Sequence, residues 1–147
     1  MSKAKYDLRI AKKPITKAFN DLKKHGIIGR HNYLCCQSCG HHAFSCDKIE
    51  NYIFYHNQCL DSFRHWGIVH MYHGLKPEQA QIVIDAFENN GMFVHWDRDH
   101  NTCISVCLNR EGYDALIESE ERERKREEAY RKAVEEERKR QQEEEEE

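Results

Sequence analysis

Apolar residues that recur three and four positions apart predict two amphipathic helices. The first begins at Pro14, ends at Gly26 and Gly29, and carries the apolar positions Ile15, Ala18, Phe19 and Leu22. The second begins at Pro77, ends at residues 89–91, and carries the apolar positions Ala80, Val83, Ile84 and Phe87. Residues at these spacings share one helix face, so each segment has a side that can pack against a sheet.

Four other segments have the β-branched and aromatic content of strands. They are residues 51–58, 67–74, 91–97 and 102–108. Both alternating faces of 67–74 contain apolar side chains, so we expect this strand in the centre of the sheet. The last two segments flank residues 98–101 and predict a hairpin.

Three segments with less distinct patterns complete the predicted order of elements. Residues 27–36 can add a fifth strand, residues 59–66 a short helix or wide loop, and residues 40–50 a loop without clear periodicity. The order predicts an α+β fold with a four- or five-stranded mixed sheet and helices packed on one face. We expect an N-terminal arm at 1–13, one domain at 14–110 and a charged helical tail at 111–147.

A long charged helix is predicted after Tyr113, where the composition changes. Residues 118–147 contain neither Gly nor Pro, and acidic residues repeatedly precede Lys or Arg by four positions, as in Glu120 and Arg124. Each such pair stabilises a helix by roughly 0.2–0.5 kcal/mol. A coiled coil, the alternative, needs apolar a and d positions over several heptads. Apolar or aromatic residues interrupt the charge only at Ala129, Tyr130, Ala133 and Val134, which favours a solvated single helix.

Charge and cysteine content limit the classes of function and location. Residues 1–110 contain 14 Lys or Arg and 10 Asp or Glu, whereas residues 111–147 contain 9 and 16. The mildly basic body gives only weak support for nucleic-acid binding, and the acidic tail is a candidate docking arm for a protein partner. Without an apolar N-terminal segment or a long apolar run, we expect no membrane partner. Seven cysteines, an odd number, are typical of free thiols in the cytoplasm.

The densest cluster of residues that could bind a metal lies at residues 34–42, with the sequence LCCQSCGHH. Cys36-x-x-Cys39-Gly has the spacing of a zinc knuckle, because two intervening residues let both sulfurs face one ion. The second half of a four-ligand site can come from His56-x-x-Cys59, or from His41, His42 or Cys46. Cys35 is expected to be a core thiol, and free, partly buried cysteines remain the alternative to a metal site.

Other chemistry is less well supported by these residues. Redox chemistry needs a Cys-x-x-Cys at the start of a helix, and no amphipathic helix is predicted after Cys39. No spacing identifies a nucleophile and its base, so catalytic residues are unknown. A stacking platform for RNA bases is conceivable at Tyr52, Phe54, His70 and Tyr72, although such residues are more often core and strand formers.

The chain resembles a family of small α+β domains, mostly bacterial, that is labelled only as a domain of unknown function. The resemblance covers about residues 15–108 and rests on Cys35-Cys36-x-x-Cys39-Gly40-His41 and Phe54-Tyr55-His56-x-Gln58. An acidic residue usually stands in that family where this chain has Cys59. The resemblance therefore favours Cys36, Cys39, His41 and His56 as the shared set of candidate ligands. It implies no reaction.

These patterns predict a binding or interaction module with a structural zinc site formed from Cys36, Cys39, His41, His56 and Cys59. The alternative is a small metal- or thiol-dependent enzyme that uses the same residues. The number of protein ligands separates the two, because four ligands close a zinc site, whereas three leave a position for water.

Overall fold

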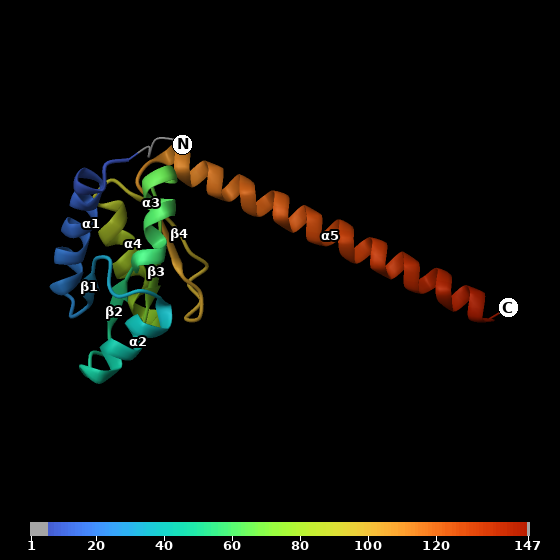
Figure 1. The fold of residues 1–147 in the computed structure, drawn as a ribbon, viewed down its shortest axis with the longest axis horizontal. Helices are drawn as coiled ribbons and strands as arrows, with labels where there is room; N and C mark the ends of the chain where they lie inside the picture. The colour runs from blue at the N-terminus through green and yellow to red at the C-terminus, as the bar shows by residue number, and fades with distance from the viewer. Residues whose placement is uncertain (1–5, 147) are drawn as a thin grey trace. The chain divides into compact units, whose positions relative to one another are not determined.

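A five-stranded mixed sheet is the centre of the fold in the computed structural model, which describes residues 6–146 (Figure 1). The strands are β1 (Ile28–Arg30), β2 (Tyr52–Phe54), β3 (Ile68–His73), β4 (Phe93–His95) and β5 (Ile104–Cys107). Their order is β1-β2-β3-β5-β4, with β1 and β2 parallel and the other neighbours antiparallel. The central position of β3 and the β4–β5 hairpin are as predicted.

Five α-helices complete the described chain. They are α1 (Leu8–Lys23), α2 (Gln37–Cys46), α3 (Leu60–Trp66), α4 (Ala80–Glu88) and α5 (Arg110–Glu146). Short 3₁₀ turns at Asn57–Cys59 and Pro77–Gln79 precede α3 and α4. The predicted α+β class, with a mixed sheet and a long charged C-terminal helix, is confirmed.

The first helix begins six residues before its predicted start. Asp7 caps α1, because its carboxylate accepts a hydrogen bond of 3.0 Å from the backbone N–H of Arg9. Pro14, expected to open the helix, lies inside it, so that prediction was wrong. The N-terminal cap and the burial of Ala11 hold the turns before the proline. Residues 1–5 of the expected arm lie outside the described residues.

Helices α1 and α4 pack against each other and against one face of the sheet. The core that they share with the sheet contains Ile15, Phe19 and Leu22 of α1, Val83 and Phe87 of α4, and Ile53, Val69, Met71, Ile104 and Val106 of the strands. Both predicted apolar stripes therefore supply core residues, although Ile84 is only partly buried.

Helix α2 packs on the other face of the sheet, where a loop was predicted. Successive strand residues point to opposite faces, so Phe54 points away from the core that contains Ile53. A Cβ on Gly40 of α2 would lie 2.3 Å from the Phe54 ring. Phe44 stacks on Tyr52 with 4.1 Å between ring centroids. The expected loop is thus a helix, and helices lie on both faces.

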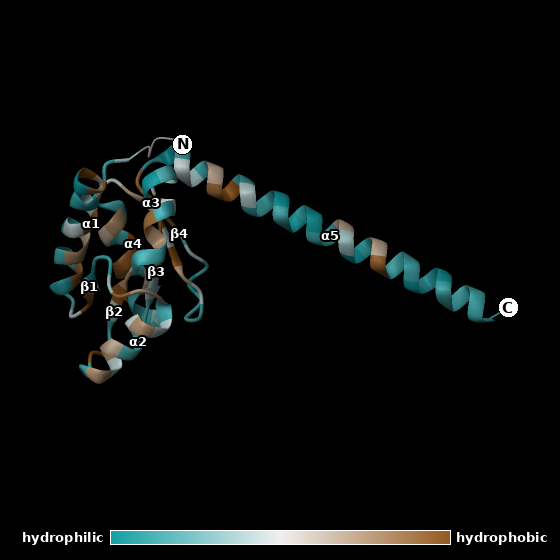
Figure 2. Cartoon of the chain, viewed as in Figure 1, coloured by the Kyte–Doolittle hydropathy of each residue, from teal (hydrophilic) through white to brown (hydrophobic). Residues whose placement is uncertain are grey.

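The chain divides into two compact units after Tyr113. Beyond this point α5 is a continuous helix without a buried residue. Figure 2 shows mostly hydrophilic residues along it, with short apolar interruptions. None of the helices in the described part of the chain combines the length and the apolar character needed to cross a lipid bilayer.

Candidate metal centre

A strained loop delivers three cysteines to the start of α2. Asn32 and Leu34 have positive φ angles of 42° and 62°, a conformation that costs a residue such as leucine about 1–2 kcal/mol. Hydrogen bonds from the Tyr33 N–H to the Tyr55 carbonyl (2.7 Å) and from the Asn57 N–H to the Leu34 carbonyl (3.1 Å) hold the loop beside the end of β2. Strain of this kind is common at functional sites.

The first turn of α2 brings the cysteines together. Cys36 is the N-cap residue, and its carbonyl accepts the first helical hydrogen bond from the Gly40 N–H at 3.1 Å. Cys39 lies one turn later. The sulfurs of Cys35, Cys36 and Cys39 all lie within 4.8 Å of one another. Among residues 6–146, no other group of three or more Cys, His, Asp or Glu ligand atoms is so compact.

The sulfur spacing fits a thiophilic metal ion. Cys35 Sγ lies 3.5 Å from Cys39 Sγ and 3.9 Å from Cys36 Sγ. A zinc–sulfur bond of about 2.3 Å corresponds to about 3.8 Å between two sulfurs of a tetrahedron. Cys35 and Cys39 are exposed and Cys36 is half-buried, so an ion can reach all three from solvent. The expectation that Cys35 is a core thiol was wrong.

The local electrostatics distinguish two of the thiols. The pKa of Cys36 is lowered, first by the backbone N–H of Cys39 and then by the Cys39 and Cys35 thiols, which stabilise its thiolate. The pKa of Cys39 is raised to about 11, because its hydrogen bonds with Cys36 and Cys35 favour the neutral thiol. The helix start therefore favours one thiolate in this group before a cation arrives.

The structure unites two of the five predicted ligands and leaves three outside the group. Cys36 and Cys39 are joined by Cys35. His56 and Cys59 contact each other instead, with the Cys59 sulfur 3.6 Å from His56 Nδ1, and both are buried. His56 Nδ1 also accepts a hydrogen bond of 3.2 Å from the backbone N–H of Gln58.

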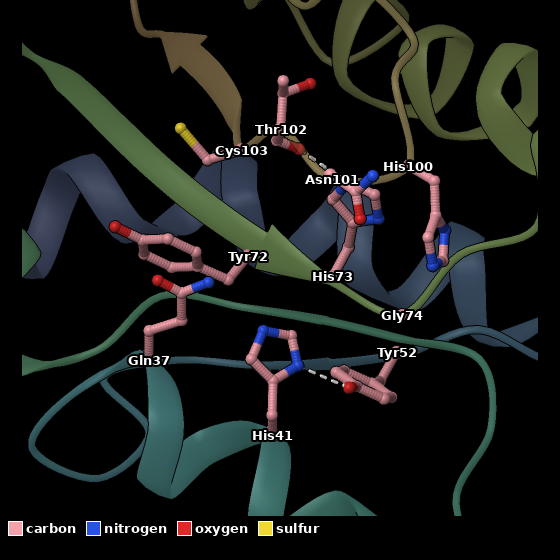
Figure 3. Close-up of a pocket in the computed structure, with 10 residues that line it drawn as sticks. All are labelled: Gln37, His41, Tyr52, Tyr72, His73, Gly74, His100, Asn101, Thr102 and Cys103. Carbon is pink, nitrogen blue, oxygen red and sulfur yellow. Dashed lines mark hydrogen bonds between the residues drawn. The ribbon is translucent and has the colours of Figure 1, made fainter.

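His41, the remaining predicted ligand, belongs to a cavity on the same face of the sheet as α2. Its Nδ1 lies 2.5 Å from the Tyr52 hydroxyl. The cavity has a volume of about 530 Å³. Figure 3 shows the residues that line it. Its walls are Gln37 and His41 of α2, Tyr52 of β2, Tyr72 and His73 of β3, Gly74, and residues 100–103 before β5.

Two imidazoles fix the wall that residues 100–103 form. His73 Nε2 donates to the Thr102 carbonyl (2.8 Å), and its Nδ1 accepts from the Leu75 N–H (3.3 Å). His100 Nδ1 donates to the Leu75 carbonyl (2.9 Å). Because carbonyls only accept and a backbone N–H only donates, His73 is held as a neutral tautomer. The pKa of His73 is lowered, chiefly by burial.

The sequence had singled out two residues of this cavity for a different role. Tyr52 and Tyr72 were considered as an open stacking platform, but α2 covers the sheet there and Phe54 is buried beneath it. Gln37, Asn101 and Cys103 carried no recognisable signal. His100 was expected only as part of the hairpin loop at residues 98–101.

A comparison with protein families is consistent with one domain that contains both the cysteine group and the cavity. Residues 3–111 match the model of a family described as a domain of unknown function, DUF6891. The chain belongs to the DUF6891 family. The DUF6891 match is wider than the resemblance seen at residues 15–108, and it includes the cysteine group and the cavity while ending at the start of α5. No curated protein and no solved structure matches the chain significantly.

Proposed function

We propose that this DUF6891 domain binds a thiophilic metal ion, zinc above all, through Cys35, Cys36 and Cys39. The observation that supports the proposal is the spacing of the sulfurs: Cys35 Sγ lies 3.9 Å from Cys36 Sγ and 3.5 Å from Cys39 Sγ, close to the edge of about 3.8 Å in a zinc–thiolate tetrahedron, and all three lie within 4.8 Å of one another. Thiolates are the ligands that zinc and other soft ions prefer, and two of these thiols are exposed.

The proposed site is open and not closed. Three thiolates occupy three tetrahedral positions, and the described residues supply no fourth ligand within the same group. The fourth position is then available to water or to a ligand from another molecule. This favours reversible metal binding over the closed structural zinc site that the sequence suggested. An open position is also what a metal-dependent reaction at the same residues would require.

Metal content of single variants tests the ligand set. The full chain, purified under reducing conditions, should contain about one zinc ion by elemental analysis. Cys35→Ser, Cys36→Ser and Cys39→Ser should each lose most of it. Cys46→Ser is the matched control, because Cys46 is also an exposed thiol of α2 but lies outside the group. Full zinc content in all three cysteine variants would refute the site.

The number of thiolate ligands separates an open from a closed site. Cobalt substituted for zinc gives charge-transfer absorption that grows with each thiolate and ligand-field bands that report four- or five-coordination. We expect three thiolates and one exchangeable ligand, so that added imidazole or azide shifts the ligand-field bands. Bands that do not respond, together with loss of metal in His41→Ala or His56→Ala, would indicate a closed site of the kind first predicted.

Thiol–disulfide exchange is a second candidate, because α2 supplies the helix whose apparent absence argued against it. Cys36 is at the N-cap and Cys39 lies one turn later. The Cys36 thiolate would attack a disulfide of a substrate protein and release one substrate thiolate. The Cys39 thiolate would then attack the mixed disulfide. This second attack breaks the mixed disulfide, releases the second substrate thiolate and forms the Cys36–Cys39 disulfide. The substrate gains two electrons, and its two thiolates take up protons equal in number to those that Cys36 and Cys39 lost on ionising, through solvent.

Glutathione equilibration distinguishes this candidate from metal binding. In metal-free buffer, a redox-active pair should form a Cys36–Cys39 disulfide reversibly, with a reduction potential in the range of cellular dithiols. Peptide mapping by mass spectrometry would identify the linkage, with Cys46 as the internal reference. Reduced cysteines throughout the titration would exclude exchange and leave metal binding as the function of the group.

A further inference from the structure

The cavity beside α2 has hydrogen-bonding groups without partners. Within residues 6–146, no protein group bonds the side-chain amides of Gln37 and Asn101, the hydroxyl of Tyr72, or the Nε2 atoms of His41 and His100. Figure 3 shows the second ring nitrogen of His41 turned toward Gln37 and Tyr72. These groups come from α2, β3 and the residues before β5, and all of them line the same cavity.

The walls of this cavity carry no formal charge. None of the ten lining residues is Lys, Arg, Asp or Glu. A phosphate or carboxylate placed here would lose its hydration without gaining a cation. The volume of about 530 Å³ lies within the range of small-molecule sites, and is too small for a folded partner. The ligand should therefore be small, uncharged and rich in donors and acceptors.

The lining also suits a flat ring. Two tyrosines and three histidines contribute to it. Side-chain amides present a donor and an acceptor together, which is the pattern that pairs with the edge of a nucleobase, adenine in particular. Aromatic side chains with amides and imidazoles are the usual surroundings of an unpaired base in proteins.

We propose that this cavity is a binding site for an uncharged nucleoside. The amides of Gln37 and Asn101 read the edge of the base from opposite walls, and His41 and His100 supply further hydrogen bonds. The bonds from His73 to Thr102 and from His100 to Leu75 hold the far wall in place before the ligand arrives. The site shares no residue with the cysteine group, although Gln37 directly follows Cys36 in the chain.

Calorimetric titration of the full chain tests the ligand class. The probes are adenosine, guanosine, cytidine and uridine, each compared with its 5′-monophosphate and with ribose. We expect saturable binding of at least one nucleoside, weaker binding of its monophosphate because the added charges meet no cation, and no binding of ribose. The proposal is overturned if no nucleoside saturates at millimolar concentration, or if a monophosphate binds as tightly as its nucleoside.

Variants and a chemical probe locate the binding. Gln37→Ala and Asn101→Ala remove exposed amides and should each weaken nucleoside binding by about tenfold, while Gln142→Ala on α5 should not. Bound nucleoside should also slow the alkylation of Cys103, which lines the cavity, and leave that of Cys46 unchanged. Wild-type affinity in both amide variants, or equal effects on the two thiols, would place the ligand elsewhere and refute the assignment.

Discussion

Gly40 allows α2 to lie directly on the sheet beside the cysteine group. A Cβ at this position would lie 2.3–2.4 Å from two atoms of the Phe54 ring, and Phe54 is fully buried. Neither the ring nor the helix can move without disturbing the aromatic packing of Phe44 and Tyr52. We expect Gly40→Ala to lower the free energy of unfolding by about 1–3 kcal/mol in urea denaturation.

Ser38→Ala is the matched control for this variant, because Ser38 is an exposed residue of the same helix. Its effect should stay within about 0.5 kcal/mol. If Gly40→Ala were as stable as the wild type, the close packing of α2 on Phe54 would be wrong.

Half-buried histidines should make the stability of the domain depend on pH. His31 Nδ1 lies 2.7 Å from the Tyr55 hydroxyl and its Nε2 lies 2.9 Å from the Thr16 hydroxyl. The pKa of His31 is lowered by burial and by Lys12, and burial also lowers the pKa of His70. The folded state therefore binds protons less readily than the unfolded chain, whose histidines titrate near pH 6.5.

Stability should consequently fall as the pH decreases below about 6.5, and stay level above it. Each histidine adds a slope of at most about 1.4 kcal/mol per pH unit, less where water reaches the ring. Urea denaturation at pH 7.5 and 5.5 measures the difference, and His31→Gln should reduce it. A domain that is equally stable at both pH values would show that these rings accept protons without cost.

At the scale of an element, α1 contains an unusual internal proline. Pro14 is the seventh residue of the helix, and it cannot donate the hydrogen bond that the Ile10 carbonyl would accept. Pro14→Ala should restore that bond and raise the free energy of unfolding by about 1–2 kcal/mol, allowing for the greater entropy of the unfolded chain. Thermal melting followed by circular dichroism measures the gain.

Lys13→Ala provides the comparison for Pro14→Ala, since Lys13 is exposed at the preceding position. It tests whether an alanine alone stabilises α1. The free energy of unfolding should change by no more than about 0.5 kcal/mol. A lower melting temperature for Pro14→Ala would mean that the ring contributes more by packing than it costs in hydrogen bonding.

Helix α2 shows why one element was missed while others were predicted. The stripes of α1 and α4 repeat apolar residues over two turns, and that repetition is readable in a sequence. In α2 only Gly40 and Phe44 are buried, and most of the residues around them are Cys, His and Ser, which have weak helix preference. Its position is determined by packing on Phe54, which is a tertiary contact.

The same distinction applies to the two candidate sites. Cys36 and Cys39 could be paired from sequence because their spacing is local. Cys35 joined them only through the positive φ angle of Leu34, which no sequence pattern indicated. The cavity combines residues from α2, β2, β3 and the segment before β5, and such a set becomes visible only when the fold has brought these segments together.

At the scale of the whole molecule, the two units differ in how they are stabilised. Residues up to Tyr113 contain the sheet and its core, whereas α5 buries no residue. The charged pairs four positions apart, such as Glu127 and Arg131, stabilise the helix locally by roughly 0.2–0.5 kcal/mol each. Their contribution is weakened by salt, and the core does not depend on it.

A truncation that ends at Glu118 tests this independence. Because the removed residues that the structure describes include no buried residue, the melting temperature of the core, followed by near-ultraviolet circular dichroism, should match that of the full chain within about 2 °C. The far-ultraviolet helix signal should fall sharply, and the full chain should lose part of that signal at high salt while the truncated chain does not. A markedly lower core melting temperature after truncation would mean that the charged helix contributes to the stability of the sheet.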